Sequence, residues 1–182
     1  MQEVYPGLFV GDQIDYQNLQ NREELLGWAI VHACKEPFHR DFVGYSGRGA
    51  PTDDPEYYFA RRGNELALNL IDVSHVSYIS QQAIDAGLLF IHEHLHDSSE
   101  QWNVLVHCNR GQSRGPGLAL LYLHLFTDEY PESLAVSELA FRGLYPATIQ
   151  APASMVTWQS TGVNPPGDAS CVIERRTRSI LS

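Results

Sequence analysis

Short apolar runs alternate with stretches of helical periodicity along this chain, and this alternation constrains the fold more than any other feature. Three runs have the length and the polar flanks of buried strands, at residues 28–32, 66–71 and 104–107. Apolar side chains recur every three or four positions after Ser80 and again after Pro116. Strands that alternate with helices predict a single α/β domain with a central, largely parallel sheet flanked by helices.

The first third of the chain carries weaker signals. Residues 4–10 predict a turn that leads into a short strand, and Asp15 is expected to cap a helix that runs to about Leu26. From 35 to 64 the periodicity disappears among glycines, prolines, charges and aromatic residues, which predicts a long loop insertion.

The last third predicts one more helix and a tail. The helix should run from Pro131 to about Arg142, with Gly143 in the stop position. Residues 161–182 combine an Asn-Pro-Pro-Gly turn with small residues and a basic cluster, which predicts a flexible tail. The domain is therefore expected to span residues 1–160.

Charge and cysteine content exclude several classes of function. The chain has 12 Lys and Arg against 22 Asp and Glu, a formal net charge of −10. This sign disfavours a nucleic-acid binder, which needs a basic surface, and an anionic membrane as partner. Three widely spaced cysteines (Cys34, Cys108 and Cys171) form neither a disulfide framework nor a metal-binding pair. With no signal peptide and no apolar run of bilayer length, a cytoplasmic location is expected.

One segment carries a chemical signature. His107-Cys108-x5-Arg114 lies between a predicted buried strand and a predicted helix, where backbone N–H groups and the helix dipole attract an anion. The same positive surroundings should hold the sulfur of Cys108 as a nucleophilic thiolate. Arg114 offers a planar fork to two phosphate oxygens, and Gly111 lets the backbone bend around the ligand.

A phosphate ester attacked by this thiolate needs a proton for its leaving group. Asp72 follows the predicted strand at 66–71, at the sheet edge where open parallel sheets form their sites. We expect Asp72 to act as general acid and then, once ionised, as base for the water that clears the cysteinyl phosphate. Asp53, Asp54 and Asp85 are the fallback acids.

The segment from His107 to Arg114 resembles the His-Cys-x5-Arg signature of the cysteine-based protein phosphatases, and its surroundings resemble the compact dual-specificity branch. Tyr5-Pro6-Gly7-Leu8-Phe9-Val10-Gly11 is similar to the opening strand of that branch, and Leu70-Ile71-Asp72 to its general-acid strand. Phe141-x-x-Leu144-Tyr145-Pro146 is similar to the closing helices of small phage and bacterial members.

The resemblance implies a metal-free, cofactor-free enzyme that hydrolyses phosphate monoesters. Cys108, Arg114 and Asp72 would be its catalytic residues. Six further residues would bind the phosphate group or support the loop: His107, Asn109, Arg110, Gly111, Gln112 and Ser113. The expected partners are a phosphorylated protein or a small phosphate ester, with phosphate-like anions in the loop. Arg110 either widens the positive field or simply faces solvent.

One departure from the family pattern has a kinetic consequence. A Ser or Thr usually follows the signature arginine and helps the thiolate leave, but Gly115 and Pro116 stand here. Breakdown of the cysteinyl phosphate is therefore expected to be slow relative to its formation. Ser113 could substitute for the missing hydroxyl.

Two other motifs compete with this interpretation. His92-Glu93-x-x-His96 has the spacing of a zinc site, but no third ligand is obvious, and a polar helix surface is the simpler explanation. Gly111-x-Ser113-x-Gly115 has the form of a hydrolase nucleophile elbow, but the only later histidine, His124, precedes every later acid.

Two alternative functions stay open. A phosphate-recognition module would bind phosphoprotein without turnover, as the missing hydroxyl suggests. A rhodanese-like sulfurtransferase would use a similar anion-binding loop around a persulfide on Cys108.

Overall fold

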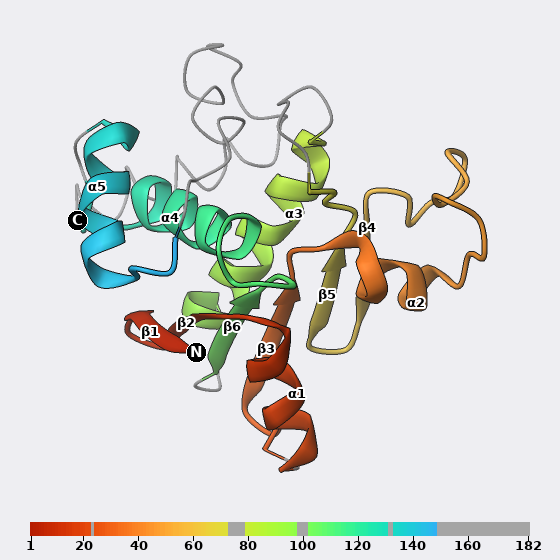
Figure 1. The fold of residues 1–182 in the computed structure, drawn as a ribbon, viewed down its shortest axis with the longest axis horizontal. Coiled ribbons are helices and arrows are strands. Elements are labelled where there is room, and N and C mark those ends of the chain that lie inside the picture. Colours follow the sequence, from red (N-terminus) through yellow and green to blue (C-terminus); the bar gives the residue numbers. More distant parts are fainter. Residues whose placement is uncertain (23, 73–78, 98–101, 131–132, 149–182) are drawn as a thin grey trace.

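The computed structural model describes residues 1–22, 24–72, 79–97, 102–130 and 133–148. Its centre is a six-stranded sheet with strand order β1-β2-β6-β3-β5-β4 (Figure 1). The strands are β1 (Gln2–Tyr5), β2 (Leu8–Gly11), β3 (Trp28–His32), β4 (Phe59–Arg62), β5 (Glu65–Leu68) and β6 (Asn103–His107). The helices are α1 (Gln13–Asn21), α2 (Arg40–Val43), α3 (Gln81–His92), α4 (Arg114–Phe126) and α5 (Leu134–Leu144), with short wide turns η1 (Lys35–His39) and η3 (Glu93–Asp97).

The four inner strands, β2, β6, β3 and β5, run parallel, and the edge strands β1 and β4 pair antiparallel with their neighbours. Parallel strands need crossover connections. The chain supplies α1 between β2 and β3 and α3 between β5 and β6, whereas the connection from β3 to β5 contains η1, α2 and β4. The expected α/β architecture with a largely parallel sheet is confirmed. No helix among the described residues has the length and apolar character needed to cross a bilayer.

The two faces of the sheet carry separate apolar cores. On β6, Val104 and Val106 pack into the larger core, which α3 and α4 cover, whereas Leu105 packs with Tyr16 of α1 on the opposite face. Figure 1 shows α4 and α1 on opposite sides of the sheet. Because both faces of the inner strands are buried, these strands appear in the sequence as continuous apolar runs.

Three helix boundaries differ from the prediction. Asp12, not Asp15, caps α1: its side chain accepts from the backbone of Asp15, and the Asp15 carboxylate accepts in return from the backbone of Asp12. The helix ends at Asn21, before the predicted Leu26. Gly143 lies inside the last turn of α5 instead of stopping it.

The segment 35–64 is not a structureless loop, so that prediction was wrong. It contains η1, α2 and the edge strand β4, which pairs with β5. The sequence of β4 is Phe-Ala-Arg-Arg, and only its alanine is buried, so no apolar run marks it. The predicted tail, 161–182, lies outside the described residues.

Candidate active site

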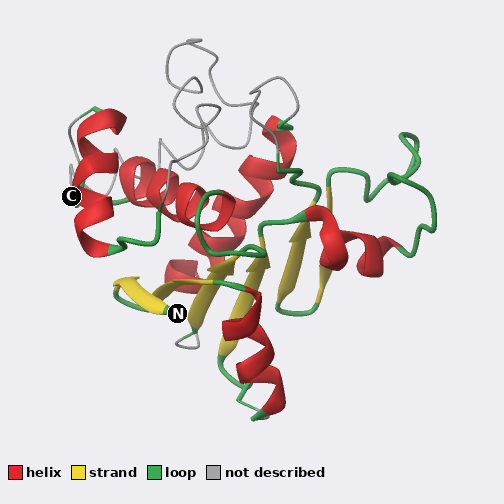
Figure 2. Ribbon diagram, in the orientation of Figure 1, coloured by secondary structure: helices red, strands yellow, loops and turns green. Residues whose placement is uncertain are grey.

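The β6–α4 loop, residues 108–113, leaves the carboxyl end of β6 beside the ends of β2 and β3. Figure 2 shows this connection in green over the ends of the central strands. Cys108 begins the loop and is buried, and Ser113 is the residue that precedes α4. The loop therefore joins the carboxyl end of a central parallel strand to the N-terminus of a helix, which is the position where open α/β sheets bind ligands.

Gly111 bends the loop in a way that a side chain would oppose. Its φ is +63°, and a Cβ atom there would lie 2.9 Å from the carbonyl oxygen of Gly11 and 3.0 Å from the hydroxyl of Tyr145. The bend thus requires glycine both for the left-handed conformation and for the close approach to the last residue of β2.

Gly115 also permits a close approach. A Cβ atom at this position would lie 3.1 Å from the carbonyl carbon of His107 and 3.2 Å from the amide nitrogen of Cys108. The first turn of α4 therefore lies directly against the backbone that carries Cys108. This packing gives a structural reason for glycine where the family pattern has a hydroxyl-bearing residue.

The guanidinium of Arg114 donates hydrogen bonds to a backbone oxygen and to a side-chain oxygen. Its Nη1 donates to the carbonyl oxygen of Leu70 at 3.0 Å, and its Nη2 donates to Oδ1 of Asn109 at 2.8 Å. The carbonyl of Leu70 also accepts from the amide of Lys35. These contacts fix the direction of a nearly buried arginine at the start of α4.

Asp72 lies beside Arg114, although not at the end of a strand as predicted. β5 stops at Leu68, and Asp72 belongs to the irregular segment that follows. Its Oδ2 is 3.5 Å from Nη2 of Arg114, and its side chain is 76% exposed. The fold thus places Asp72 beside Arg114, from which it is separated by 42 positions in the sequence, and leaves the carboxylate free to reach a molecule bound at the loop that begins with Cys108.

Asn109 connects the loop to two other segments. While its Oδ1 accepts from Arg114, its Nδ2 donates to the carbonyl of Glu36 at 2.8 Å and to Oε1 of Gln13 at 3.3 Å. Asn109 therefore links Arg114 to η1 and to α1 through hydrogen bonds.

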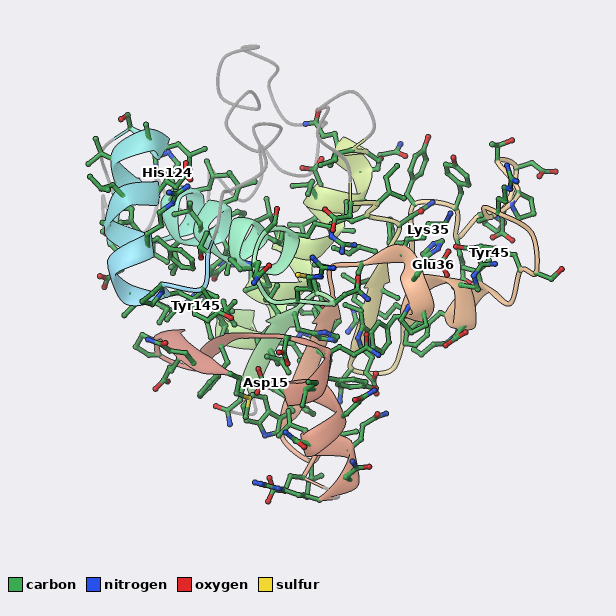
Figure 3. All side chains as sticks on the ribbon, in the orientation of Figure 1. Asp15, Lys35, Glu36, Tyr45, His124 and Tyr145 are labelled. Carbon is green, nitrogen blue, oxygen red and sulfur yellow. The ribbon has the colours of Figure 1, made fainter. Side chains whose placement is uncertain are left out.

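Cys34 and Tyr145 also lie near Cys108, and neither was predicted to take part in catalysis. Cys34 is fully buried, its sulfur accepts from the backbone of Asn109, and burial raises its pKa to about 12. Burial, with the charges of Asp15, Cys108 and Asp12, raises the pKa of Tyr145 to about 12. In Figure 3, Tyr145 lies on the α5 side and Lys35 on the α2 side of the site. No sequence pattern distinguishes these residues from core residues.

Beneath the loop, His107 contacts a second buried imidazole. Its Nε2 lies 2.6 Å from Nδ1 of His32, and Nε2 of His32 lies 2.9 Å from Oε2 of Glu65. The same carboxylate oxygen accepts from the hydroxyl of Tyr16 at 2.8 Å. Of these hydrogen-bonded side chains, only His107 could be selected from the sequence, because its partners come from three other elements.

The other predicted phosphate-binding residues differ in their burial. Gln112 and Ser113 are half-buried in the loop, and Arg110 is exposed. Arg61 forms a two-pronged ion pair with Glu93, at 2.8 Å in both contacts, so this glutamate of the zinc-like motif already has a partner. Among the described residues, no group of three metal-binding side chains could hold a metal ion.

Arg62 pairs with Glu56 inside the 35–64 segment. Of the fallback acids, Asp54 accepts from the backbone of Glu56, and Asp85 lies on α3, where burial raises its pKa. None of these contacts involves the loop, whereas Asp72 contacts Arg114.

The fold is that of the dual-specificity phosphatases. The structure of DUSP15 superposes with a TM-score of 0.57 at 18% identity, covering 87% of this chain and 86% of that chain. The phosphatase domain of Yvh1 from Chaetomium thermophilum gives 0.56 at 16% identity, covering 86% and 92%. The human tyrosine phosphatase-like serine/threonine/tyrosine-interacting protein gives 0.54 at 16% identity, covering 100% and 98%.

In sequence alone, no family model matches the chain, and no curated protein matches it. At these identities the structural likeness establishes the compact cysteine-phosphatase fold, and the chemistry must be argued from the site itself.

Proposed function

We propose that this protein is a metal-independent phosphatase that hydrolyses phosphate monoesters through a cysteinyl phosphate. The observation that carries the proposal is the placement of Cys108 and Arg114 at the two ends of one tight loop, with Asp72 beside the guanidinium. The substrates that fit such a site are phosphorylated tyrosine, serine or threonine side chains, or a related phosphate ester.

The reaction would proceed in two displacements. The thiolate of Cys108 attacks phosphorus while the ester oxygen leaves with a proton from Asp72, which forms the cysteinyl phosphate. Water then attacks the phosphorus, Asp72 takes its proton, and the thiolate leaves with inorganic phosphate as the product. Arg114 and the backbone N–H groups of the loop bind the equatorial oxygens in both steps.

The site needs a reduced thiol, because an oxidised sulfur is no nucleophile. Cys34 and Cys108 are both free cysteines in the structure. This requirement supports a reducing compartment, and we propose the cytoplasm.

A phosphate-binding module without turnover is the second candidate. It is favoured by Gly115, which leaves no hydroxyl after the arginine to assist the departing thiolate. The similarity to a protein described as a phosphatase-like interacting protein supports the same candidate.

Hydrolysis of p-nitrophenyl phosphate separates the two candidates. The phosphatase should release nitrophenolate, and Cys108→Ser should abolish the release while retaining affinity for a phosphopeptide. Cys34→Ser, a matched change of a buried thiol, should keep most of the activity. Phosphopeptide binding by a parent protein that gives no hydrolysis would establish the module instead.

A further inference from the structure

We propose that Glu65, His32 and His107 form a proton-binding chain under the β6–α4 loop, which takes up a proton when a dianion binds above it. This inference rests on the proposed phosphate site and adds a role that the three catalytic residues do not fill. In it, Glu65 and His32 are positioning residues that act through His107.

The register of the sheet assembles the chain. His32 and His107 are direct partners on the parallel strands β3 and β6, and both are fully buried. Glu65, on β5, is the register partner of Ile30, which lies two positions before His32, so Glu65 and His32 lie on the same face of the sheet. The three side chains therefore form a continuous hydrogen-bonded row that runs from a half-exposed carboxylate to the base of the loop.

Aromatic rings enclose the two imidazoles. Tyr16 stacks on His107 with centroids 5.1 Å apart, and Phe38 stacks on His32 at 4.1 Å. The groups that face the pair come from five segments and are Tyr16 from α1, Phe38 from η1, Phe42 from α2, Glu65 from β5 and Cys108 from the loop. Such an enclosure strengthens every electrostatic interaction inside it.

The direction of the first two hydrogen bonds is fixed by chemistry. Burial and then the hydrogen bond and charge of Glu65 raise the pKa of Tyr16, so its hydroxyl stays protonated and donates to the carboxylate. Burial raises the pKa of Glu65, but hydrogen bonds from His32 and Tyr16 outweigh it, and the net pKa is lowered. An ionised Glu65 accepts from Nε2–H of His32, which leaves Nδ1 of neutral His32 as an acceptor.

His107 must then donate from Nε2 to His32, so its Nδ1 carries no proton. This atom is buried and lacks a well-formed hydrogen bond. The backbone of Cys108 interacts with the ring of His107 and favours its protonated form. The backbone group that does so is the carbonyl oxygen, because it accepts a hydrogen bond from a protonated ring nitrogen. Two neutral imidazoles carry two N–H groups, but the row has three bridges, to Glu65, between the rings, and to Cys108.

One added proton fills all three bridges. The result is an imidazolium at His32 or His107, next to the negative Glu65, with Nδ1–H of His107 donating to the carbonyl of Cys108. Only N–H bonds change, and the proton comes from solvent. In the free protein, burial lowers the pKa of His32 and lowers that of His107 well below its ordinary value, so both imidazoles are neutral and one bridge stays open.

A dianion in the loop changes this balance because it adds negative charge above the row. Linkage then requires that anion binding and proton uptake strengthen each other. For a phosphatase, the extra positive charge would stabilise the bound phosphate at the moment when charge accumulates in the loop.

Calorimetry of sulfate binding tests the proposal, since sulfate does not titrate between pH 5.5 and 7. The Cys108→Ser protein is used so that thiol ionisation does not contribute. Binding enthalpies measured in buffers of different ionisation enthalpy give the number of protons taken up. We expect clear uptake, together with an affinity that rises by up to about tenfold for each pH unit lowered.

Three double variants in the Cys108→Ser background make the test specific. Adding Glu65→Gln or His32→Asn should abolish the difference between buffers while sulfate still binds. Adding Glu93→Gln, a matched change of a glutamate paired with Arg61, should leave the uptake unchanged. Circular dichroism confirms that each variant is folded.

The results that would contradict the proton chain alone differ from the result that would contradict both proposals. Uptake that is absent in Cys108→Ser, or that persists in both the Glu65→Gln and His32→Asn proteins, overturns the proton chain and leaves the proposed phosphatase intact. A folded Cys108→Ser protein that binds no sulfate overturns the anion-binding loop, and with it both proposals.

Discussion

At the scale of single residues, two buried cysteines differ in their surroundings. Cys108 begins the loop that ends in Arg114, whereas Cys34 lies under the loop backbone, and burial raises its pKa to about 12. Two thiols of the same chain therefore lie in different surroundings, one at the start of the proposed anion-binding loop and one buried beneath its backbone.

Iodoacetamide should therefore distinguish the two thiols. In the folded protein at neutral pH, we expect carboxamidomethylation of Cys108 and little reaction of Cys34, because only a thiolate reacts rapidly. Peptide mapping by mass spectrometry measures each site, with the urea-unfolded protein as control. Equal labelling of the two, or labelling of Cys108 only in alkaline buffer, would contradict the prediction.

Asp72 should matter most for substrates with poor leaving groups. Asp72→Asn removes the proton donor, and we expect the rate with an alkyl phosphate to fall by about 100-fold or more. The loss with p-nitrophenyl phosphate should be much smaller, because nitrophenolate leaves without protonation. Asp53→Asn, an exposed aspartate in the 35–64 segment, is the matched control. A uniform loss on both substrates would argue against a general acid.

At the scale of elements, the contact between the start of α4 and the end of β6 determines what residue can follow Arg114. A side chain at Gly115 would crowd the backbone of His107 and Cys108. The missing hydroxyl and the tight helix approach are therefore two aspects of one packing arrangement.

If the protein is the proposed phosphatase, rapid mixing with p-nitrophenyl phosphate should show a burst, because the second displacement lacks a hydroxyl donor. Gly115→Ser and Gly115→Ala should both lower stability, by about 1–3 kcal/mol, since each adds a Cβ atom in a crowded position. Only the serine variant should accelerate breakdown of the cysteinyl phosphate, so the alanine variant is its control. Linear release by the unmodified protein, or identical second steps in the two variants, would refute this explanation.

At the scale of the whole molecule, the sheet separates two cores, and the smaller one contains titratable groups. Tyr16, Ile30 and Leu105 belong to this core, and the buried pair His32 and His107 extends it toward the loop. Acid should act on this side of the sheet first.

Stability should fall as the pH drops below about 6.5. Burial lowers the pKa of His32 and His107 relative to the ordinary value of 6.5, so the unfolded chain binds protons in this range before the folded protein does. The melting temperature should decrease from pH 7 to pH 5, and His32→Asn should flatten this dependence. Sulfate should oppose the decrease in the parent protein. A melting temperature independent of pH over this range would contradict the expectation.

Local sequence determined the inner strands, the helices α3 and α4, and the loop from Cys108 to Arg114, because hydrophobic periodicity and a motif of fixed spacing depend on neighbouring residues. It also identified Asp72, which the structure places next to Arg114. The edge strand β4 escaped prediction because a half-exposed strand with two arginines carries no apolar signal.

Only the tertiary structure decided which distant residues support the loop. Asn109 contacts Glu36 of η1 and Gln13 of α1, and His107 contacts His32 on the paired strand β3. Contacts of this kind leave no periodic signal, since each depends on where the sheet register and the helix crossovers bring two separate segments together.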